Sequence, residues 1–135
     1  LFKTSGGKYI APQVIENRMK RSPFIEQIMV IGESEKMPSA LIQPDFVYIK
    51  SWLQKNKTNI LDDFKNICEN KELLFKIDEE IKKINKEFGD WERIKRFELT
   101  PEIWSIENGL LTPTMKLKRK SILRKFNHLK EKIYT

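Results

Sequence analysis

The sequence predicts a single α+β domain in which helices pack against a sheet of a few short strands. Two observations lead to this fold class: short β-branched apolar runs bounded by turn residues, and longer segments whose apolar residues are spaced by three and four. A length of 135 residues suffices for one domain with its own core. Hydrophobic residues make up 39% of the chain and charged residues 33%, as in ordinary globular domains, and no run of about 18 apolar residues is present.

The first 44 residues are expected to form two hairpins with a helix between them. Strands at residues 1–3 and 8–10 flank the turn Ser5-Gly6-Gly7, where paired glycines adopt positive φ at low cost. Pro12 suits a first helical position, and that helix should continue to about Lys20. The apolar runs 25–32 and 40–42, separated by the polar turn 33–36, predict the central hairpin of the sheet.

Residues 45–89 are expected to be helical. Asp45 is a suitable N-cap, and Gly89 is expected to end the last and longest helix. The apolar faces of three successive helices are predicted at Phe46, Ile49 and Leu53; at Leu61, Phe64 and Ile67, after the polar run 55–59; and at Leu74, Ile77, Ile81, Ile84 and Phe88.

The C-terminal third is expected to contain one strand, one loop and one basic helix. The strand covers residues 94–99 and the loop residues 100–114. A single final helix is predicted from apolar residues spaced four, three and four, at Ile122, Phe126, Leu129 and Ile133.

The net charge of +7 is concentrated at the C-terminal end. Residues 1–111 carry 18 basic and 18 acidic side chains, whereas residues 112–135 carry eight basic ones and a single acidic one, Glu131. Such an excess on one segment is typical of a surface that faces anions. The composition leaves open whether these are nucleotide or coenzyme phosphates, nucleic acid or an acidic lipid surface.

Residues 109–119, Gly-Leu-Leu-Thr-Pro-Thr-Met-Lys-Leu-Lys-Arg, predict an exposed turn that leads Lys116 into the basic helix. Pro113 fixes its own φ and restricts Thr112, which stiffens the approach to the lysine. An ammonium group at such a tip is suited to contact a phosphate or carboxylate oxygen. The local pattern alone, however, favours a solvated lysine.

This segment resembles the C-terminal motif of adenylate-forming acyl-CoA ligases of the long-chain fatty acid type. Residues 99–108, Leu-Thr-Pro-Glu-Ile-Trp-Ser-Ile-Glu-Asn, are similar to the same branch. At the other end, residues 3–12 and the later pair Ile15-Glu16 resemble the family's segment just after the interdomain hinge. The resemblance implies the mobile C-terminal domain of such an enzyme.

The resemblance also implies a reaction in two steps. ATP, with Mg²⁺, and a fatty acid give an acyl-adenylate and pyrophosphate, and the thiol of coenzyme A then displaces AMP. In the family, the lysine corresponding to Lys116 bridges the fatty-acid carboxylate and the ATP α-phosphate, and is therefore the expected catalytic residue. The domain then rotates and presents its glycine hairpin to the pantetheine tunnel.

Further site residues are carried over from the family. The tunnel is expected at Ser5, Gly6, Gly7 and Lys8, with Gly6 the best positional match and Gly7 the alternative. A basic residue that contacts the coenzyme A 3′-phosphate in related ligases aligns with Asn85, so its neighbour Lys86 is the candidate for that contact and is otherwise a solvated lysine. Residues expected to face ATP or its phosphates are Lys3, Lys118 and Arg119. No metal site is expected in this chain.

On this hypothesis residues 1–135 are one C-terminal domain cut from a longer cytoplasmic protein. Its parts are a post-hinge glycine hairpin (1–11), a helix and sheet core (12–44), a helical segment (45–89), a strand and lysine loop (94–118) and a basic helix (119–134). The N-terminal domain that would bind ATP and the fatty acid is the expected partner. The fragment alone should be inactive, and a peripheral membrane contact stays open.

Two alternatives remain. Within the superfamily, the acceptor could be the phosphopantetheine of an acyl-carrier protein instead of coenzyme A. In a different class, the chain could be a small basic nucleic-acid-binding domain, although its terminal helix lacks the interleaved exposed aromatic residues that stack on bases.

The remaining chemistry-bearing residues are interpreted as structural. Cys68 is expected to be a buried apolar side chain, and as the only cysteine it excludes an intramolecular disulfide. His128 has no carboxylate or cysteine at a useful spacing. Solvated helix faces are expected for Asp62-Asp63 and residues 78–80, and either core or interdomain packing for Trp52, Trp91 and Trp104.

Overall fold

The computed structural model describes residues 1–56 and 63–135, and over these residues it confirms the α+β class. Leu61, Asp62 and residues 57–59 of the polar run lie outside the described residues. In the described part of the chain the elements are, in order, β1 (Phe2–Lys3), β2 (Tyr9–Ile10), α1 (Pro12–Met19), β3 (Ile25–Ile31), β4 (Ser39–Pro44), α2 (Phe46–Lys55), α3 (Phe64–Cys68), α4 (Lys71–Asn85), the 3₁₀ turn η1 (Asp90–Glu92), β5 (Arg96–Leu99), α5 (Arg119–Lys125) and α6 (Asn127–Tyr134).

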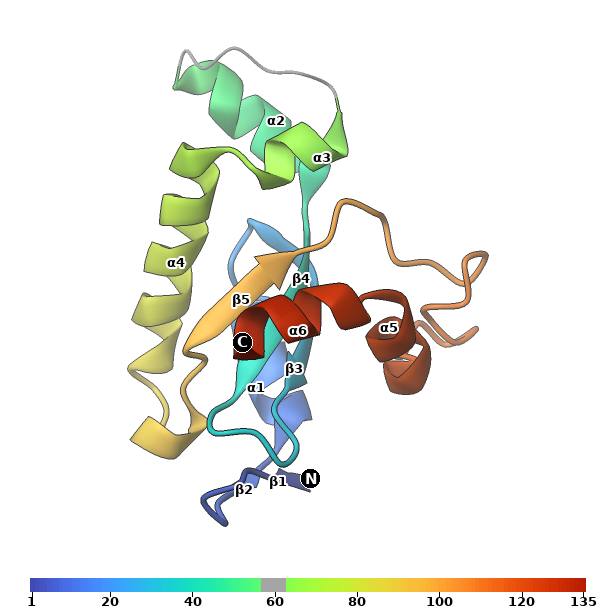
Figure 1. Cartoon of the computed structure of the whole chain (residues 1–135). Coiled ribbons are helices and arrows are strands. Elements are labelled where there is room, and N and C mark those ends of the chain that lie inside the picture. The colour runs from blue at the N-terminus through green and yellow to red at the C-terminus, as the bar shows by residue number, and fades with distance from the viewer. Residues whose placement is uncertain (57–62) are drawn as a thin grey trace.

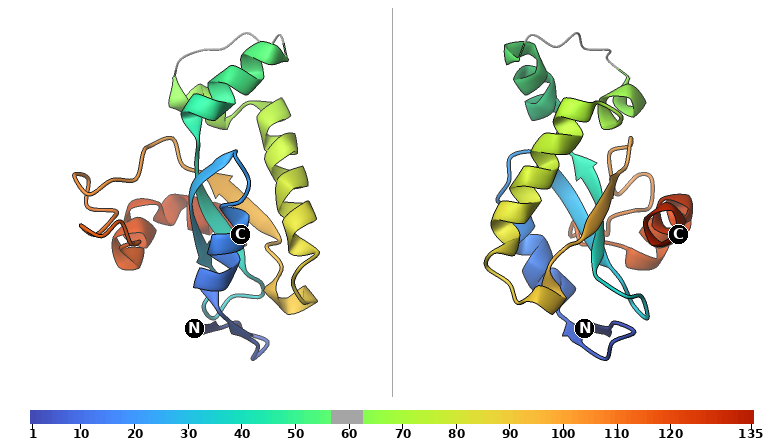
Figure 2. Two further views of the ribbon diagram at one scale, coloured as in Figure 1. Left: turned by 180° about the vertical axis from the view of Figure 1, so that it is seen from behind. Right: turned by 60° about the vertical axis from the view of Figure 1, so that its left-hand side comes forward.

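The central sheet has the strand order β3-β4-β5, with β3 antiparallel and β5 parallel to β4. The predicted central hairpin is confirmed, with Ile28 opposite Ile42 and Val30 opposite Ala40. Helices α1 and α4 lie on one face of the sheet, and α5 and α6 lie on the other (Figures 1 and 2). The middle strand β4 is therefore buried along its whole length.

Side-chain alternation along β3 divides the core into two clusters. Ile28 and Val30 belong to the cluster that includes residues of α1, α2 and α4. Met29 and Ile31 belong to the other cluster, which includes Trp104, residues 110–111 and residues of α5 and α6. Successive side chains of a strand point to opposite faces, so the segment that leads to Lys116 is built on the face opposite to α1.

The predicted helices of residues 45–89 exist, but the longest one ends earlier than expected. Asp45 caps α2 as predicted, because its Oδ1 accepts a hydrogen bond from Tyr48 N at 3.0 Å. The prediction that Gly89 ends the longest helix is wrong: α4 ends at Asn85, and Gly89 has φ −67° and precedes η1. The physical reason is Asn85, whose buried side chain bonds both the N–H and the C=O of Ile94, each at 3.0 Å. These two hydrogen bonds direct the chain back towards β5.

The prediction of one continuous final helix is also wrong. Phe126 separates α5 from α6 with φ −108° and ψ 26°. Its ring is buried and stacks on Trp104, with ring centroids 6.2 Å apart. Because the chain bends at this anchor, Ile122 and Ile133 still reach the same core cluster.

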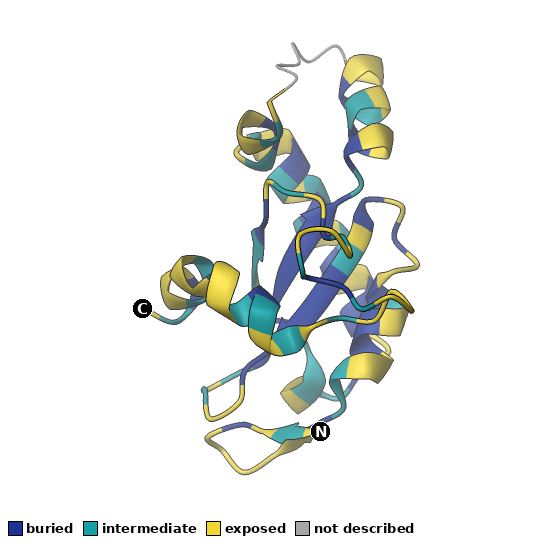
Figure 3. Cartoon of the chain, turned by 90° about the vertical axis from the view of Figure 1, so that its right-hand side faces the viewer, coloured by how far each residue is buried: buried dark blue, intermediate teal, exposed yellow. Residues whose placement is uncertain are grey.

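The glycine hairpin, formed by β1, β2 and the turn between them, lies at one end of the molecule beside the N-terminus, and most of its residues are exposed (Figures 1 and 3). It is attached to the turn between β3 and β4 by two backbone hydrogen bonds. Ser34 N donates to Lys3 O at 2.9 Å, and Ser5 N donates to Glu35 O at 2.8 Å. Among the described residues, no helix has the length and apolarity needed to cross a membrane.

Candidate functional site

Lys116 lies near the tip of a narrow turn, residues 111–117, which we call the lysine turn. Leu111 and Leu117 form an antiparallel bridge at its base, and Thr112 N donates to Lys116 O at 2.8 Å. Leu110 and Leu111 are buried in the second core cluster, so apolar contacts hold the base in place. The Lys116 residue itself is exposed.

Hydrogen bonds within the lysine turn restrict its tip. Thr112 Oγ1 accepts a hydrogen bond from Lys116 N at 3.0 Å and lies 3.1 Å from Thr114 Oγ1. Met115 has φ 65°, a left-handed conformation that is uncommon for residues other than glycine. The backbone at Lys116 is thus held in one conformation while its side chain faces outwards.

An ion pair connects the end of the lysine turn to α1. Arg119 donates from Nη2 to Glu16 Oε1 at 2.7 Å and from Nη1 to Glu16 Oε2 at 2.8 Å. The Glu16 side chain is only 7% exposed, and its Oε2 also accepts a hydrogen bond from Val30 N at 2.7 Å. Both terminal nitrogens of Arg119 are thus bonded to Glu16, and the expectation that Arg119 faces ATP stays a prediction.

A shallow hollow of about 290 Å³ lies beside Lys116. Its walls come from α1, from Gln27 and Ile28 of β3, and from residues 115–117 of the lysine turn. None of the hairpin residues 5–8 borders it. The structure thus places Lys116 next to α1 and does not bring the two predicted sites together, which agrees with their separate positions in Figures 1 and 2.

The two glycines of the hairpin have different structural requirements. Gly7 has φ +84°, which a side chain rarely tolerates. Gly6 has a negative φ, and a Cβ added there would meet nothing within 4 Å. The backbone of this domain therefore requires glycine at position 7. It sets no such requirement at position 6, so the presence of glycine there needs another explanation.

Aromatic rings accompany the lysines of the hairpin. Lys8 Nζ lies 5.6 Å from the ring centroid of Trp91, and Lys3 Nζ lies 5.5 Å from that of Tyr9. Both rings are exposed, with 49% of Trp91 and 63% of Tyr9 accessible. Trp91 is thus not a core residue, and its alternative role in interdomain packing stays a prediction. Trp104 is buried, as the core interpretation predicted. Trp52 is partly buried and packs edge-to-face on Phe24 at 5.3 Å.

The structure places the remaining predicted basic residues on the surface. Lys86 is exposed at the C-terminal end of α4, while the aligned Asn85 is occupied by its bonds to Ile94. Lys118 has an exposed side chain, and its backbone N–H donates to Leu110 O at 2.9 Å. Two further basic residues of the C-terminal segment form ion pairs, Lys125 with Glu102 and Lys132 with Glu98. The excess charge is therefore partly neutralised locally.

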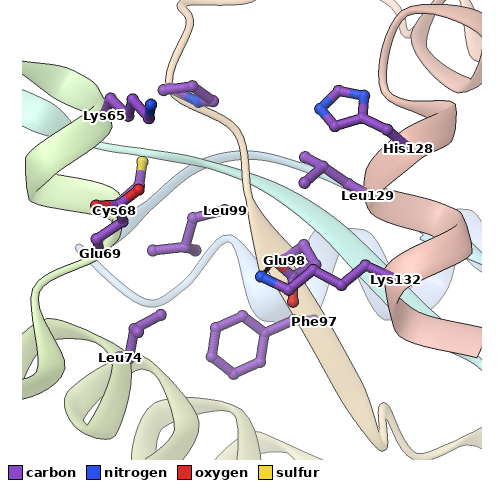
Figure 4. A pocket seen from close by; sticks show the side chains of 11 residues that line it. Lys65, Cys68, Glu69, Leu74, Phe97, Glu98, Leu99, His128, Leu129 and Lys132 are labelled. Carbon is purple, nitrogen blue, oxygen red and sulfur yellow. Dashed lines mark ion pairs between the residues drawn. The ribbon is translucent and has the colours of Figure 1, made fainter. Parts of the chain in front are cut away.

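A larger hollow of about 400 Å³ opens elsewhere, between α3 and α4, β5 and α6 (Figure 4). None of the predicted site residues lines it. Cys68 does, partly buried, and burial together with the nearby charge of Glu69 raises the pKa of its thiol to about 12. A thiol that stays protonated is a poor nucleophile, so Cys68 gives this hollow no reactive thiolate. His128 at the same hollow is exposed.

Sequence reasoning missed the partnership of Glu16 with Arg119. Glu16 was part of the motif that suggested the family, yet nothing in the local pattern predicts a partner 103 residues away. A glutamate on the buried side of a short helix, next to Ile15, was the available signal. Buried carboxylates need partners, and the structure supplies them.

Comparison with known proteins identifies the family. The profile of the AMP-binding enzyme C-terminal domain matches residues 2–135. The chain is 38% identical over 138 residues to "Long-chain-fatty-acid--CoA ligase 1" of Homo sapiens, covering 100% of this chain and 20% of that protein. It is 34% identical over 134 residues to "Long-chain-fatty-acid--CoA ligase FadD15" of Mycobacterium tuberculosis, covering 99% of this chain and 22% of that protein. The chain thus spans about a fifth of the length of these relatives.

Solved structures show the same fold. An adenylation domain of a carboxylate reductase from Mycobacterium chelonae matches with a TM-score of 0.78 at 20% identity, over 98% of this chain and 19% of that one. The A-PCP didomain of a carboxylic acid reductase from Segniliparus rugosus matches with a TM-score of 0.76 at 23% identity, over 98% of this chain and 17% of that one. The expected fold is confirmed, and the chain belongs to the family of AMP-binding enzyme C-terminal domains.

Proposed function

We propose that this chain is the C-terminal domain of a long-chain fatty acid–CoA ligase. In this proposal it supplies Lys116 to adenylation and the glycine hairpin to thioester formation. The observation that carries the proposal is an exposed lysine on a braced turn, in a chain whose relatives with 34% and 38% identity are named as such ligases.

In the first step, the ammonium group of Lys116 stabilises negative charge on the fatty-acid carboxylate and the ATP α-phosphate. Such stabilisation is strongest where water is excluded. The segment before the lysine turn exposes Ile103 and Ile106, and Met115 next to Lys116 is 56% exposed. These apolar side chains suit packing against the larger domain, which would remove water around the lysine.

In the second step, the glycine hairpin replaces Lys116 at the active site. Support comes from Gly6, which has open space around it and no conformational need for glycine within this domain. A Cβ at that position would narrow a passage for the extended pantetheine arm. Because the hairpin and the lysine turn occupy different parts of the surface, one rigid-body rotation would exchange them.

Binding of ATP, Mg²⁺ and the fatty acid is assigned mainly to the rest of the full-length protein, the partner of this domain. The chain described here would then give no acyl-CoA by itself. Lys3, Lys86 and Lys118 remain proposed contacts for phosphate groups, since each is exposed. Lys8 remains a proposed residue of the pantetheine tunnel.

The test uses the full-length protein with Lys116→Ala, and Lys120→Ala as a matched exposed lysine of α5. ATP–pyrophosphate exchange with a long-chain fatty acid reports the first step, and thioester formation from supplied acyl-adenylate reports the second. Loss of a charge-stabilising group should lower exchange by roughly 10²- to 10³-fold, with transfer and the Lys120→Ala variant close to the parent. Exchange that survives Lys116→Ala would exclude the proposed role.

The acceptor is tested in the same assay. Free coenzyme A and a phosphopantetheinylated acyl-carrier protein are offered in parallel to the parent protein loaded with acyl-adenylate. A ligase of the proposed type should acylate coenzyme A. Acylation of the carrier protein alone would instead assign the domain to an acyl-carrier-protein ligase.

A further inference from the structure

We propose that the ion pair of Glu16 and Arg119 is the positioning element of the lysine turn. The inference rests on the proposed function, because it assigns these two residues to the orientation of Lys116 and not to contact with substrate. Arg119 is three residues beyond Lys116 and opens α5, and Glu16 is buried on α1.

The ion pair of Glu16 and Arg119 links α1 to α5 across one edge of the sheet. Helices α1 and α5 lie on opposite faces (Figure 2), and β3 is the edge strand between them. Glu16 Oε2 accepts a hydrogen bond from Val30 N of this strand in addition to the bond from Arg119. Three donors thus bind one buried carboxylate, at least one on each oxygen, and an otherwise unpaired N–H of the edge is satisfied.

Apolar contacts alone would leave the lysine turn free to tilt. Leu110 and Leu111 anchor its base in the core, and the bridge between Leu111 and Leu117 closes it. The apolar contacts are non-directional. The backbone hydrogen bonds at the base, from Leu110 N and Leu111 N to Ser105 O and from Lys118 N to Leu110 O, stay within residues 105–118 and do not reach α1. The fork of Arg119 on Glu16 is planar and bidentate, with distances of 2.7 and 2.8 Å, and therefore fixes the direction in which the chain leaves the turn.

Two other roles for the pair make different predictions. If Arg119 contacted phosphate directly, removal of the Glu16 charge would leave adenylation intact, because a carboxylate does not bind phosphate. If the pair merely held the fold together, its loss would weaken both half-reactions equally, since both use this domain. A positioning role predicts that either substitution lowers adenylation and spares transfer.

The experiment compares Glu16→Gln and Arg119→Lys in the full-length protein, with Arg124→Lys as a matched control on the exposed side of α5. Misplacement of a catalytic group by about 1 Å costs on the order of 10²-fold in rate. We therefore expect kcat for ATP–pyrophosphate exchange to fall by about 10- to 10²-fold in both variants. Thioester formation from acyl-adenylate should stay within about twofold of the parent, which also reports that the domain is folded.

A second comparison places each substitution in the Lys116→Ala background. If the pair acts through Lys116, Arg119→Lys should lower exchange no further there. An additive loss, an equal loss of both half-reactions, or unchanged exchange in either single variant would each overturn the inference. If instead Lys116→Ala alone leaves exchange intact, the proposed function of Lys116 is wrong, and the inference about the ion pair is wrong with it. If Lys116→Ala lowers exchange but the variants of the pair do not, only the inference is wrong, so the two failures are distinguishable.

Discussion

Two adjacent glycines of the hairpin should respond in opposite ways to the same substitution. At Gly7, alanine would have to adopt φ +84°, which costs an L-residue about 1–2 kcal/mol. Reduced freedom of the unfolded chain returns about 0.4–1 kcal/mol. The net loss of about 1 kcal/mol should lower the Tm of the purified domain by roughly 3–5 °C for a chain of this size.

Gly6→Ala should have the opposite effect on stability. Its φ is negative and the added Cβ would meet nothing within 4 Å, so only the unfolded-state term remains. Thermal unfolding of the two variants is therefore expected to give a slightly raised Tm for Gly6→Ala and a lowered one for Gly7→Ala.

For function, by contrast, Gly6→Ala is expected to be harmful although it does not destabilise the fold. In the full-length protein, Gly6→Ala should lower thioester formation from acyl-adenylate by about tenfold or more, because a misplaced reacting group is costly. ATP–pyrophosphate exchange should remain close to the parent rate. A stable Gly6→Ala variant with normal transfer would refute the assignment of Gly6 to the pantetheine passage, and a strongly destabilised one would refute the geometry behind it.

Three further predictions concern the fold. Cys68 should react slowly with iodoacetamide at pH 8 and quickly in urea, because burial keeps its pKa raised to about 12; rapid native labelling would contradict this. Asn85→Ala should lower the free energy of unfolding by about 2–4 kcal/mol, measured by urea denaturation, since it leaves both polar groups of Ile94 without their partner. Burial raises the pKa of Tyr134, so stability should decline as pH rises above about 10, and the decline should be weaker in Tyr134→Phe.

Local sequence patterns were sufficient for most elements. The apolar, β-branched runs of residues 25–32 and 40–42, separated by the polar turn 33–36, correctly predicted the central hairpin, because such runs are a property of a few neighbouring residues. The helix cap at Asp45 was predictable for the same reason. The helix ends at Asn85 and Phe126 were not, because each is set by a contact with a distant segment, Ile94 in one case and Trp104 in the other.

The sequence by itself determined the α+β class, the exposed turn around Lys116 and the glycine turn at residues 5–7. These features follow from short-range periodicity, proline and glycine, which act within a few residues. Only the tertiary structure decided that Arg119 binds Glu16, that Gly7 rather than Gly6 is required by the backbone, and that the two motifs lie apart. Such facts depend on contacts between residues up to 103 positions apart, and pairings at that distance are decided by how the sheet and its two helical layers pack.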